Sequence, residues 1–166
     1  PIELNLNLNL ENLNGGKHLL FLKARGIGAS WKGGSMPARN FFFVRNSKSY
    51  MYADSTQYLI KDGVFNKFLT FKNFINQNTP FYKYTDVKND LAGMHIRASH
   101  KDLNGNEKGF MSEVMAVTVA GKPDSIRGKR GKVTLFEEFG TFNKGGDAWE
   151  VSKSSHEEGN LVFGTM

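Results

Sequence analysis

Two adjacent glutamates, Glu137 and Glu138, follow a short apolar run in the second half of the chain, where residues 133–140 read VTLFEEFG. The run predicts a buried strand, and the carboxylates would lie at its carboxyl end. The first carboxylate could hold Mg²⁺, and the second could polarise a water that attacks a phosphate. Two solvated glutamates at a strand end would look the same in sequence. The catalytic interpretation therefore depends on a phosphate-binding loop elsewhere in the chain.

A glycine-rich turn that could bind phosphate lies upstream, where residues 23–30 read KARGIGAS. Gly26 and Gly28 permit the positive φ and close backbone approach that let successive N–H groups converge on an anion. The N-terminus of the helix predicted to follow adds positive potential, and Ser30 is placed to ligate Mg²⁺ with its hydroxyl. The predicted phosphate-binding residues are Lys23, Gly26, Ile27, Gly28, Ala29 and Ser30.

The turn departs from the usual pattern GxxxxGK[ST], in which a lysine directly follows the last glycine. Ala29 occupies that position here, and the nearest cations are Lys23, Arg25 and Lys32. A glycine-rich turn between a strand and a helix can also be an ordinary tight turn. The order of the two motifs, turn first and paired glutamates later, favours the phosphate-binding interpretation.

Short apolar runs and helical periodicities predict the elements that would position these residues. Strands are predicted at residues 18–22, 49–53, 94–98, 112–119, 133–136 and from 161 onward, with a hairpin signal at Asn104-Gly105. Helices are predicted at residues 65–79, at 149–155, in part of 31–44, and through 57–60 after a cap at Asp54 or Ser55. Strands that alternate with helices indicate an α/β fold with a mostly parallel sheet and one inserted β-hairpin.

The composition fits a single folded domain. The chain has 166 residues, 39% of them hydrophobic and 14 of them Phe, which is enough for a sizeable core. It has no cysteine, which excludes disulfides and thiolate metal sites. No apolar run approaches the length of about 18 residues that a membrane span needs, and no secretory signal is visible. The net charge of +6 admits a polyanionic partner such as nucleic acid.

A basic loop at residues 121–131 concentrates part of this charge. Its candidate DNA-binding residues are Arg127, Lys129 and Arg130, which precede the strand that ends in the paired glutamates. A run of cations without interleaved aromatic residues suits contact with the phosphate backbone. Two other interpretations stay open, a solvated charge run and an arginine that reaches the nucleotide of a neighbouring subunit.

Taken together, residues 18–166 resemble the ATPase domain of the large subunit of phage terminases. Lys23, Gly28 and Ser30 match an altered phosphate loop of the form K-x-x-x-x-G-[YFA]-S, and Arg25 resembles the arginine that family members carry inside this loop. Residues 124–130 read DSIRGKR and resemble the segment before the family's Walker B strand. Residues 158–165 read EGNLVFGT and look like the strand that leads to the coupling motif.

The resemblance implies a P-loop NTPase fold, a three-layer sandwich of the additional-strand type, that binds ATP and Mg²⁺. Lys23 and the loop amides would hold the β- and γ-phosphates, and Arg25 would act in catalysis. Ser30 and Glu137 would hold Mg²⁺, and Glu138 would activate the attacking water.

The family also implies partners: double-stranded viral DNA, a portal protein, a small terminase subunit, and further copies of the chain in a ring. The expected location is the host cytoplasm, transiently at the procapsid portal. Residues 1–17 are expected to form an N-terminal arm and residues 18–166 an ATPase domain that continues beyond this sequence into a nuclease domain. Two alternatives stay open, a helicase-like P-loop ATPase and a DNA-binding or assembly module that does not hydrolyse ATP.

Overall fold

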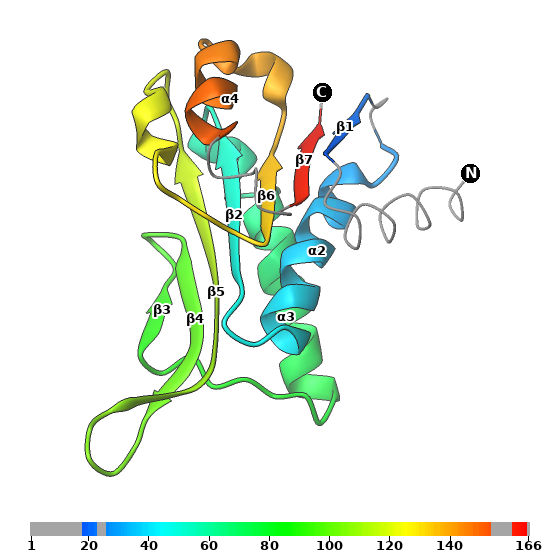
Figure 1. Ribbon diagram of the computed structural model, residues 1–166. Coiled ribbons are helices and arrows are strands. Elements are labelled where there is room, and N and C mark those ends of the chain that lie inside the picture. Colours follow the sequence, from blue (N-terminus) through cyan, green and yellow to red (C-terminus); the bar gives the residue numbers. More distant parts are fainter. Residues whose placement is uncertain (1–17, 23–25, 154–160, 166) are drawn as a thin grey trace.

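The computed structural model describes residues 18–22, 26–153 and 161–165 of the chain (Figure 1). The predicted N-terminal arm, residues 1–17, lies outside the described residues, and so do two predicted site residues, Lys23 and Arg25. The division into an arm and an ATPase domain of residues 18–166 therefore stays a prediction. No helix within the described ranges is long and apolar enough to cross a membrane.

A mostly parallel sheet forms the centre of the fold (Figure 1). In spatial order its strands are β1 (Leu19–Phe21), β7 (Leu161–Thr165), β6 (Val133–Phe136), β2 (Lys48–Ala53), β5 (Glu107–Thr118), β4 (His95–Lys101) and β3 (Lys88–Asp90). The first five strands are parallel, and β4 and β3 add to one edge in antiparallel pairing. Strands β4 and β5 are the predicted hairpin.

Helices cover both faces of this sheet. The helices are α2 (Ala29–Phe43), α3 (Val64–Asn78) and α4 (Gly145–Lys153), and the 3₁₀ turns are η1 (Thr56–Tyr58), η2 (Pro123–Ile126) and η3 (Phe139–Thr141). Helices α2 and α3 pack on one face, and α4 packs with η2 and η3 on the other. The result is the predicted three-layer α/β sandwich with an inserted β-hairpin.

Strand β2 shows why the central strands carry continuous runs of apolar residues. Met51 and Ala53 belong to the core under α2 and α3, whereas Tyr50 and Tyr52 belong to the core under α4. Successive side chains of a strand point to opposite faces, so a strand covered on both sides must be apolar at nearly every position. This is the pattern that predicted the strands from sequence.

Helix α2 is continuous, although Gly33, Gly34 and Pro37 predict only partial helix for this segment. The two glycines are required by close packing. A Cβ at Gly33 would lie 3.0 Å from a methyl carbon of Leu135 in β6. A Cβ at Gly34 would lie 2.8 Å from the Cβ of Lys67 and within contact of the α3 backbone. Tertiary contacts thus outweigh the helix propensity that glycine loses.

Two other expectations were wrong or incomplete. The helix predicted through residues 57–60 is only the single turn η1, and neither predicted cap residue caps it with its side chain. The Asp54 carboxylate instead accepts hydrogen bonds from the Gly121 N–H at 2.9 Å and the Asn143 amide at 3.1 Å. Strand β3 was not predicted, because its sequence, KND, carries no apolar pattern.

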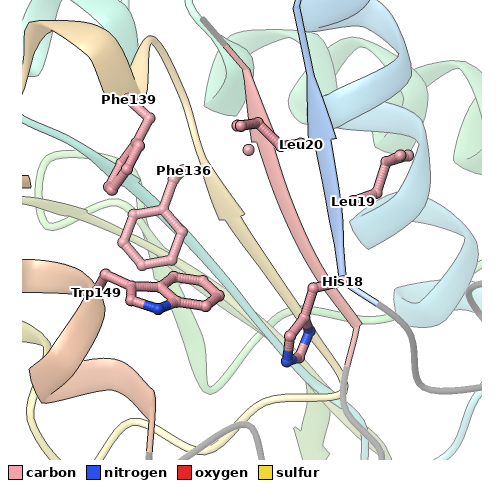
Figure 2. Close-up of a pocket in the computed structure, with 7 residues that line it drawn as sticks. His18, Leu19, Leu20, Phe136, Phe139 and Trp149 are labelled. Carbon is pink, nitrogen blue, oxygen red and sulfur yellow. The ribbon is translucent and has the colours of Figure 1, made fainter. Parts of the chain in front are cut away.

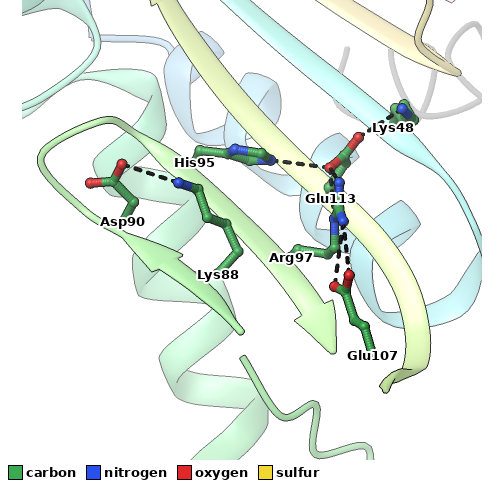
Figure 3. A network of polar contacts seen from close by, with 7 residues as sticks. All are labelled: Lys48, Lys88, Asp90, His95, Arg97, Glu107 and Glu113. Atoms are coloured by element: carbon green, nitrogen blue, oxygen red, sulfur yellow. Dashed lines mark hydrogen bonds and ion pairs between the residues drawn. The ribbon is translucent and has the colours of Figure 1, made fainter. Parts of the chain in front are cut away.

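A buried carboxylate joins the hairpin to the parallel part of the sheet (Figure 3). The Glu113 carboxylate on β5 accepts hydrogen bonds from Arg97 of β4 at 2.8 and 2.9 Å. It also lies 3.0 Å from the Lys48 ammonium of β2 and 3.1 Å from the His95 ring of β4. Glu107 extends the network by contacting Arg97 at 3.3 Å. The network therefore ties three neighbouring strands together by charge.

Burial alone would raise the pKa of the Glu113 carboxyl, but hydrogen bonds from Arg97, His95 and Lys48 outweigh burial and lower the pKa to about 2. A carboxyl whose folded pKa lies below its unfolded value of 4.5 contributes stability above pH 4.5. That contribution is lost as the pH falls toward 2.

We expect Glu113→Gln to lower the free energy of unfolding at neutral pH by about 2–4 kcal/mol, because Arg97 and Lys48 lose a buried counter-charge. Between pH 4.5 and 2 the variant should lose less stability than the parent, measured by urea unfolding at each pH. Glu107→Gln is the matched control for the loss of one carboxylate beside Arg97. The Glu107 side chain is 28% exposed, so this variant should lose less stability than Glu113→Gln. Identical acid profiles for the parent and Glu113→Gln would contradict this account of the network.

Candidate active site

The topology brings two segments from opposite ends of the chain to one edge of the sheet. Strand β1 leads through residues 26–28 into α2, and β6 leads into Glu137 and Glu138. Strand β7 lies between β1 and β6, and all three run parallel, so their carboxyl ends share this edge. In open α/β sheets, ligands bind at the carboxyl ends of strands where the connections diverge to opposite faces. Here α2 leaves toward one face and α4 returns over the other.

The described part of the glycine-rich turn adopts the backbone that the sequence predicts. Gly26 and Gly28 have φ values of 84° and 77°, in the left-handed region that favours glycine. Helix α2 begins at Ala29, so Ser30 is its second residue. The side chain of Ala29 is buried. The N-terminus of α2 therefore opens at the end of the turn, where its backbone N–H groups can meet an anion.

One hydrogen bond joins the turn to the paired glutamates. The Ser30 hydroxyl donates to Glu137 Oε1 at 2.5 Å across 107 residues of sequence. Glu137 is only 3% exposed, and its backbone N–H donates to the Tyr52 carbonyl of β2 at 2.8 Å. The two residues predicted from sequence to hold Mg²⁺ therefore lie in direct contact.

Thr165, at the end of β7, contacts both glutamates. Its hydroxyl donates to Glu137 Oε2 at 3.1 Å and accepts from the Glu138 N–H at 2.9 Å. Glu138 has φ 51° and ψ 51°, an uncommon backbone for a residue other than glycine, and such backbones concentrate at functional sites. The sequence places Thr165 in a coupling strand but predicts no role for it, because its contacts arise only when β7 enters the sheet.

Two hollows meet at Ser30. The first, about 270 Å³, is lined by the turn together with Trp31, Asp62 and Lys67. The second, about 320 Å³, is lined by Ser30, Gln57, Tyr58, Lys61, Asp62, Gly63, Glu137 and Glu138. Neither Asp62 nor Lys67 was predicted from the sequence. Lys67 lies in a segment whose aromatic periodicity indicated core packing, and nothing in one sequence reveals that α3 starts beside the turn.

Of the three cations nearest to the turn in sequence, Lys32 is the one that the structure describes. Its ammonium lies 5.9 Å from the centre of the Phe21 ring on β1. Partial burial lowers the pKa of Lys32. The side chain thus lies toward the first strand, and it does not line either hollow at Ser30.

The oxygen ligands at this edge suit Mg²⁺. Ser30 Oγ and Glu137 Oε1 are hard donors in contact with each other, and Mg²⁺ typically takes one or two protein oxygens, with phosphates and waters completing its shell. Within the described residues there is no group of three or more His, Asp or Glu side chains that could hold a metal without such help. The donor set therefore fits a metal that arrives with a phosphate ligand.

A third hollow of about 400 Å³ lies on the α4 side of the sheet (Figure 2). It is lined by His18, Leu19, Leu20, Phe136, Phe139, Trp149 and Gly164. The ring of His18 meets Trp149 edge-on, with centroids 5.7 Å apart. This apolar lining offers few donors for phosphate, so we assign the hollow no part in phosphate chemistry.

The candidate DNA-binding residues form part of the connection between β5 and β6. Arg127 is exposed and pairs with Asp124 at 2.7 Å, and the Lys129 ammonium donates to the Ser125 carbonyl at 2.7 Å. Arg130 is exposed just before β6 begins. Since Glu137 follows the other end of β6, the structure does not bring Arg130 to the paired glutamates of its own chain.

Comparison with known proteins supports the fold. No protein-family model matches the chain, and no curated protein sequence matches it. Among solved structures, the chain is similar to the ATPase domain of the large terminase of Thermus phage P74-26, with 14% identity and a TM-score of 0.68. An arginine-to-alanine mutant of that domain matches with 13% identity and the same TM-score. The match covers 90% of this chain but 59% of each solved chain. The fold that the motifs predicted is therefore the fold of a large terminase ATPase domain.

We expect Thr165→Val to lower the free energy of unfolding by about 1–3 kcal/mol, because the Glu138 N–H and an oxygen of the buried Glu137 both lose a partner. The methyl group of valine fills the space of the hydroxyl, so packing is nearly unchanged. Thr165→Ser keeps the hydroxyl and should retain more stability than valine in thermal unfolding. A serine variant less stable than the valine variant would show that packing, and not hydrogen bonding, is the role of this residue.

Proposed function

We propose that this chain is an ATP-hydrolysing motor domain of a viral DNA-packaging terminase. The observation that carries the proposal is the Ser30–Glu137 contact, because it brings a hydroxyl from a phosphate-binding turn to a strand-end carboxylate. This is the arrangement in which P-loop NTPases hold Mg²⁺. The similarity in fold to a large terminase ATPase domain supports the motor assignment.

In the proposed reaction, the N–H groups of the turn and the Lys23 ammonium bind the β- and γ-phosphates. Ser30 and Glu137 would hold Mg²⁺, and the bound metal would supply positive charge beside the phosphates. The Glu138 carboxylate accepts a hydrogen bond from the attacking water and orients it in line with the γ-phosphate. Arg25, in the same turn, stabilises the charge on the transferred group.

Thr165 would link this chemistry to the next strand. Its hydroxyl contacts the carboxylate that we assign to Mg²⁺ and the backbone of the residue that we assign to the water. A change in the position of either glutamate on hydrolysis would therefore alter a contact at the end of β7. We propose Thr165 as the positioning residue that holds the two glutamates in one geometry.

The proposed partners are duplex viral DNA, a portal protein and a small terminase subunit, with further copies of the chain forming a ring in the host cytoplasm. The charge of +6 and the exposed Arg127 and Arg130 support a polyanionic partner. An arginine of this loop could instead serve the nucleotide of a neighbouring subunit, since Arg130 lies at the far end of β6 from Glu137.

We predict that Glu138→Gln leaves ATP binding nearly intact and slows hydrolysis by about 10²-fold or more, because the amide cannot accept a proton from water. Phosphate release and binding of a fluorescent ATP analogue would be measured for the same samples, with and without duplex DNA. Glu150→Gln is the control, since Glu150 is an exposed glutamate on α4. Parent-like hydrolysis by Glu138→Gln would remove Glu138 as the base.

The same assays separate the alternatives. A parent protein that binds ATP and duplex DNA but releases no phosphate would be an assembly module without hydrolysis. Stimulation by single-stranded DNA alone would favour a helicase-like ATPase. Stimulation by duplex DNA supports the terminase assignment.

We predict that neutralising Arg127, Lys129 and Arg130 together weakens binding to duplex DNA of any sequence. The slope of log K against log salt should become shallower by about 0.9 for each DNA phosphate that the variant no longer neutralises. Neutralising Lys101 and Lys108 near the hairpin tip is the control for a general loss of charge. Unchanged DNA affinity with slower ATP hydrolysis would instead assign the loop to the nucleotide of a neighbouring subunit. Unchanged DNA affinity and unchanged hydrolysis would show that the loop is a solvated charge run.

A further inference from the structure

We propose that Lys67 of α3 supplies a phosphate-binding ammonium in addition to that of Lys23, and that the Asp62 carboxylate occupies the phosphate's place until nucleotide binds. The inference rests on the proposed function and names a further binding residue and a regulatory contact for the same site.

Lys67 and Asp62 line the same hollow as the turn. The hollow is bounded by residues 26–31 on one side and by these two residues on the other. The Lys67 ammonium pairs with the Asp62 carboxylate. A cation and its counter-ion therefore stand at the mouth of the turn whose own sequence places alanine where a lysine usually follows the last glycine.

The two partners differ sharply in how firmly they are held. The side chain of Lys67 is 11% exposed, whereas that of Asp62 is 93% exposed. The Lys67 ammonium also lies 4.6 Å from the centre of the Trp31 ring, within range of a cation–π interaction. The Trp31 ring is in turn held edge-on against Phe71 of α3. The ammonium is thus fixed by packing, while the carboxylate can turn away into solvent.

Close helix packing delivers Lys67 to this position. Gly34 lies one turn after Ser30 along α2, and a Cβ there would lie 2.8 Å from the Lys67 Cβ. The absence of a side chain at Gly34 lets α3 approach the first turns of α2. The stem of Lys67 consequently starts beside the turn and not in the middle of the helix pair.

The Lys67 side chain is largely buried, so its ammonium is more stable with a counter-charge beside it. Asp62 supplies this counter-charge without nucleotide, and a phosphate that carries more negative charge and more acceptor oxygens would supply it better. Asp62 also lines the second hollow, the one that contains Glu137 and Glu138. Displacement of Asp62 would therefore open the boundary between the phosphate-binding turn and the paired glutamates.

The test is a double-mutant cycle on ATP affinity. Lys67→Met keeps the aliphatic stem and should weaken binding of a fluorescent ATP analogue with Mg²⁺ by about tenfold or more, the size expected for one charge-assisted contact. Asp62→Asn removes the competing anion and should strengthen binding severalfold. In the double variant the gain from Asp62→Asn should vanish, because its target ammonium is gone.

Lys72→Met is the matched control. Lys72 is on the same helix and as buried as Lys67, but it lines neither hollow, so its loss should leave ATP affinity unchanged. Thermal unfolding of each variant checks folding. Asp62→Asn alters an exposed side chain, so its gain in affinity can be tested even if Lys67→Met proves unstable.

Three outcomes overturn the inference while leaving the proposed function in place: parent-like affinity for Lys67→Met, weaker binding for Asp62→Asn, or a gain from Asp62→Asn that persists without Lys67. A parent protein that does not bind ATP, or binds it equally well after Ser30→Ala, overturns the proposed function and this inference with it.

Discussion

The hydrogen bond between Ser30 and Glu137 constrains how the elements meet at the carboxyl ends of β1, β7 and β6. Its two ends are 107 residues apart, so it exists only if α2 starts at the right residue and β6 ends at the right residue. Glu137 is buried, which makes its partners obligatory, since a carboxylate removed from water must be hydrogen-bonded. Strand β7 must also enter between β1 and β6, because it brings Thr165 to the same carboxylate. The Glu137 side chain thus contacts both the start of α2 and the end of β7.

Packing on the α2 side of the sheet explains how the glycine-rich turn is held. Gly33 lets α2 lie against Leu135 of β6, the strand that ends in the paired glutamates. Gly34 lets α3 lie against α2 near its start. The same two glycines that weaken the helix locally therefore fix the distance from the turn to β6 and to α3. Glycine lowers helix propensity at these two positions, and the close contacts of α2 with β6 and α3 require it.

The parts of the structure that the sequence predicted are those whose signals are local. Residues 133–136 form β6 as predicted. All four residues are buried, and a strand buried on both faces appears in the sequence as a short, mostly apolar run. The hairpin around Asn104 and Gly105 was likewise visible in its turn residues. The contact of Lys67 with Asp62 was not, since it depends on how two helices approach each other. Strand β3 was missed because pairing with β4, and not an apolar pattern, holds it in the sheet.

The two buried glutamates Glu113 and Glu137 differ in the kind of group that donates to each carboxylate. Glu113 is held by Arg97, Lys48 and His95, whose contacts outweigh burial and keep the pKa of the carboxyl at about 2. The Arg97 guanidinium and the Lys48 ammonium can only donate, so neither could help to hold a metal beside this carboxylate. Glu137 accepts from the hydroxyls of Ser30 and Thr165. A hydroxyl oxygen also has lone pairs, so Ser30 can turn from donating to a carboxylate to ligating a cation beside it. The two carboxylates are similarly buried, so the type of donor around each one, more than the depth of burial, distinguishes the proposed metal ligand Glu137 from Glu113, which links strands of the sheet.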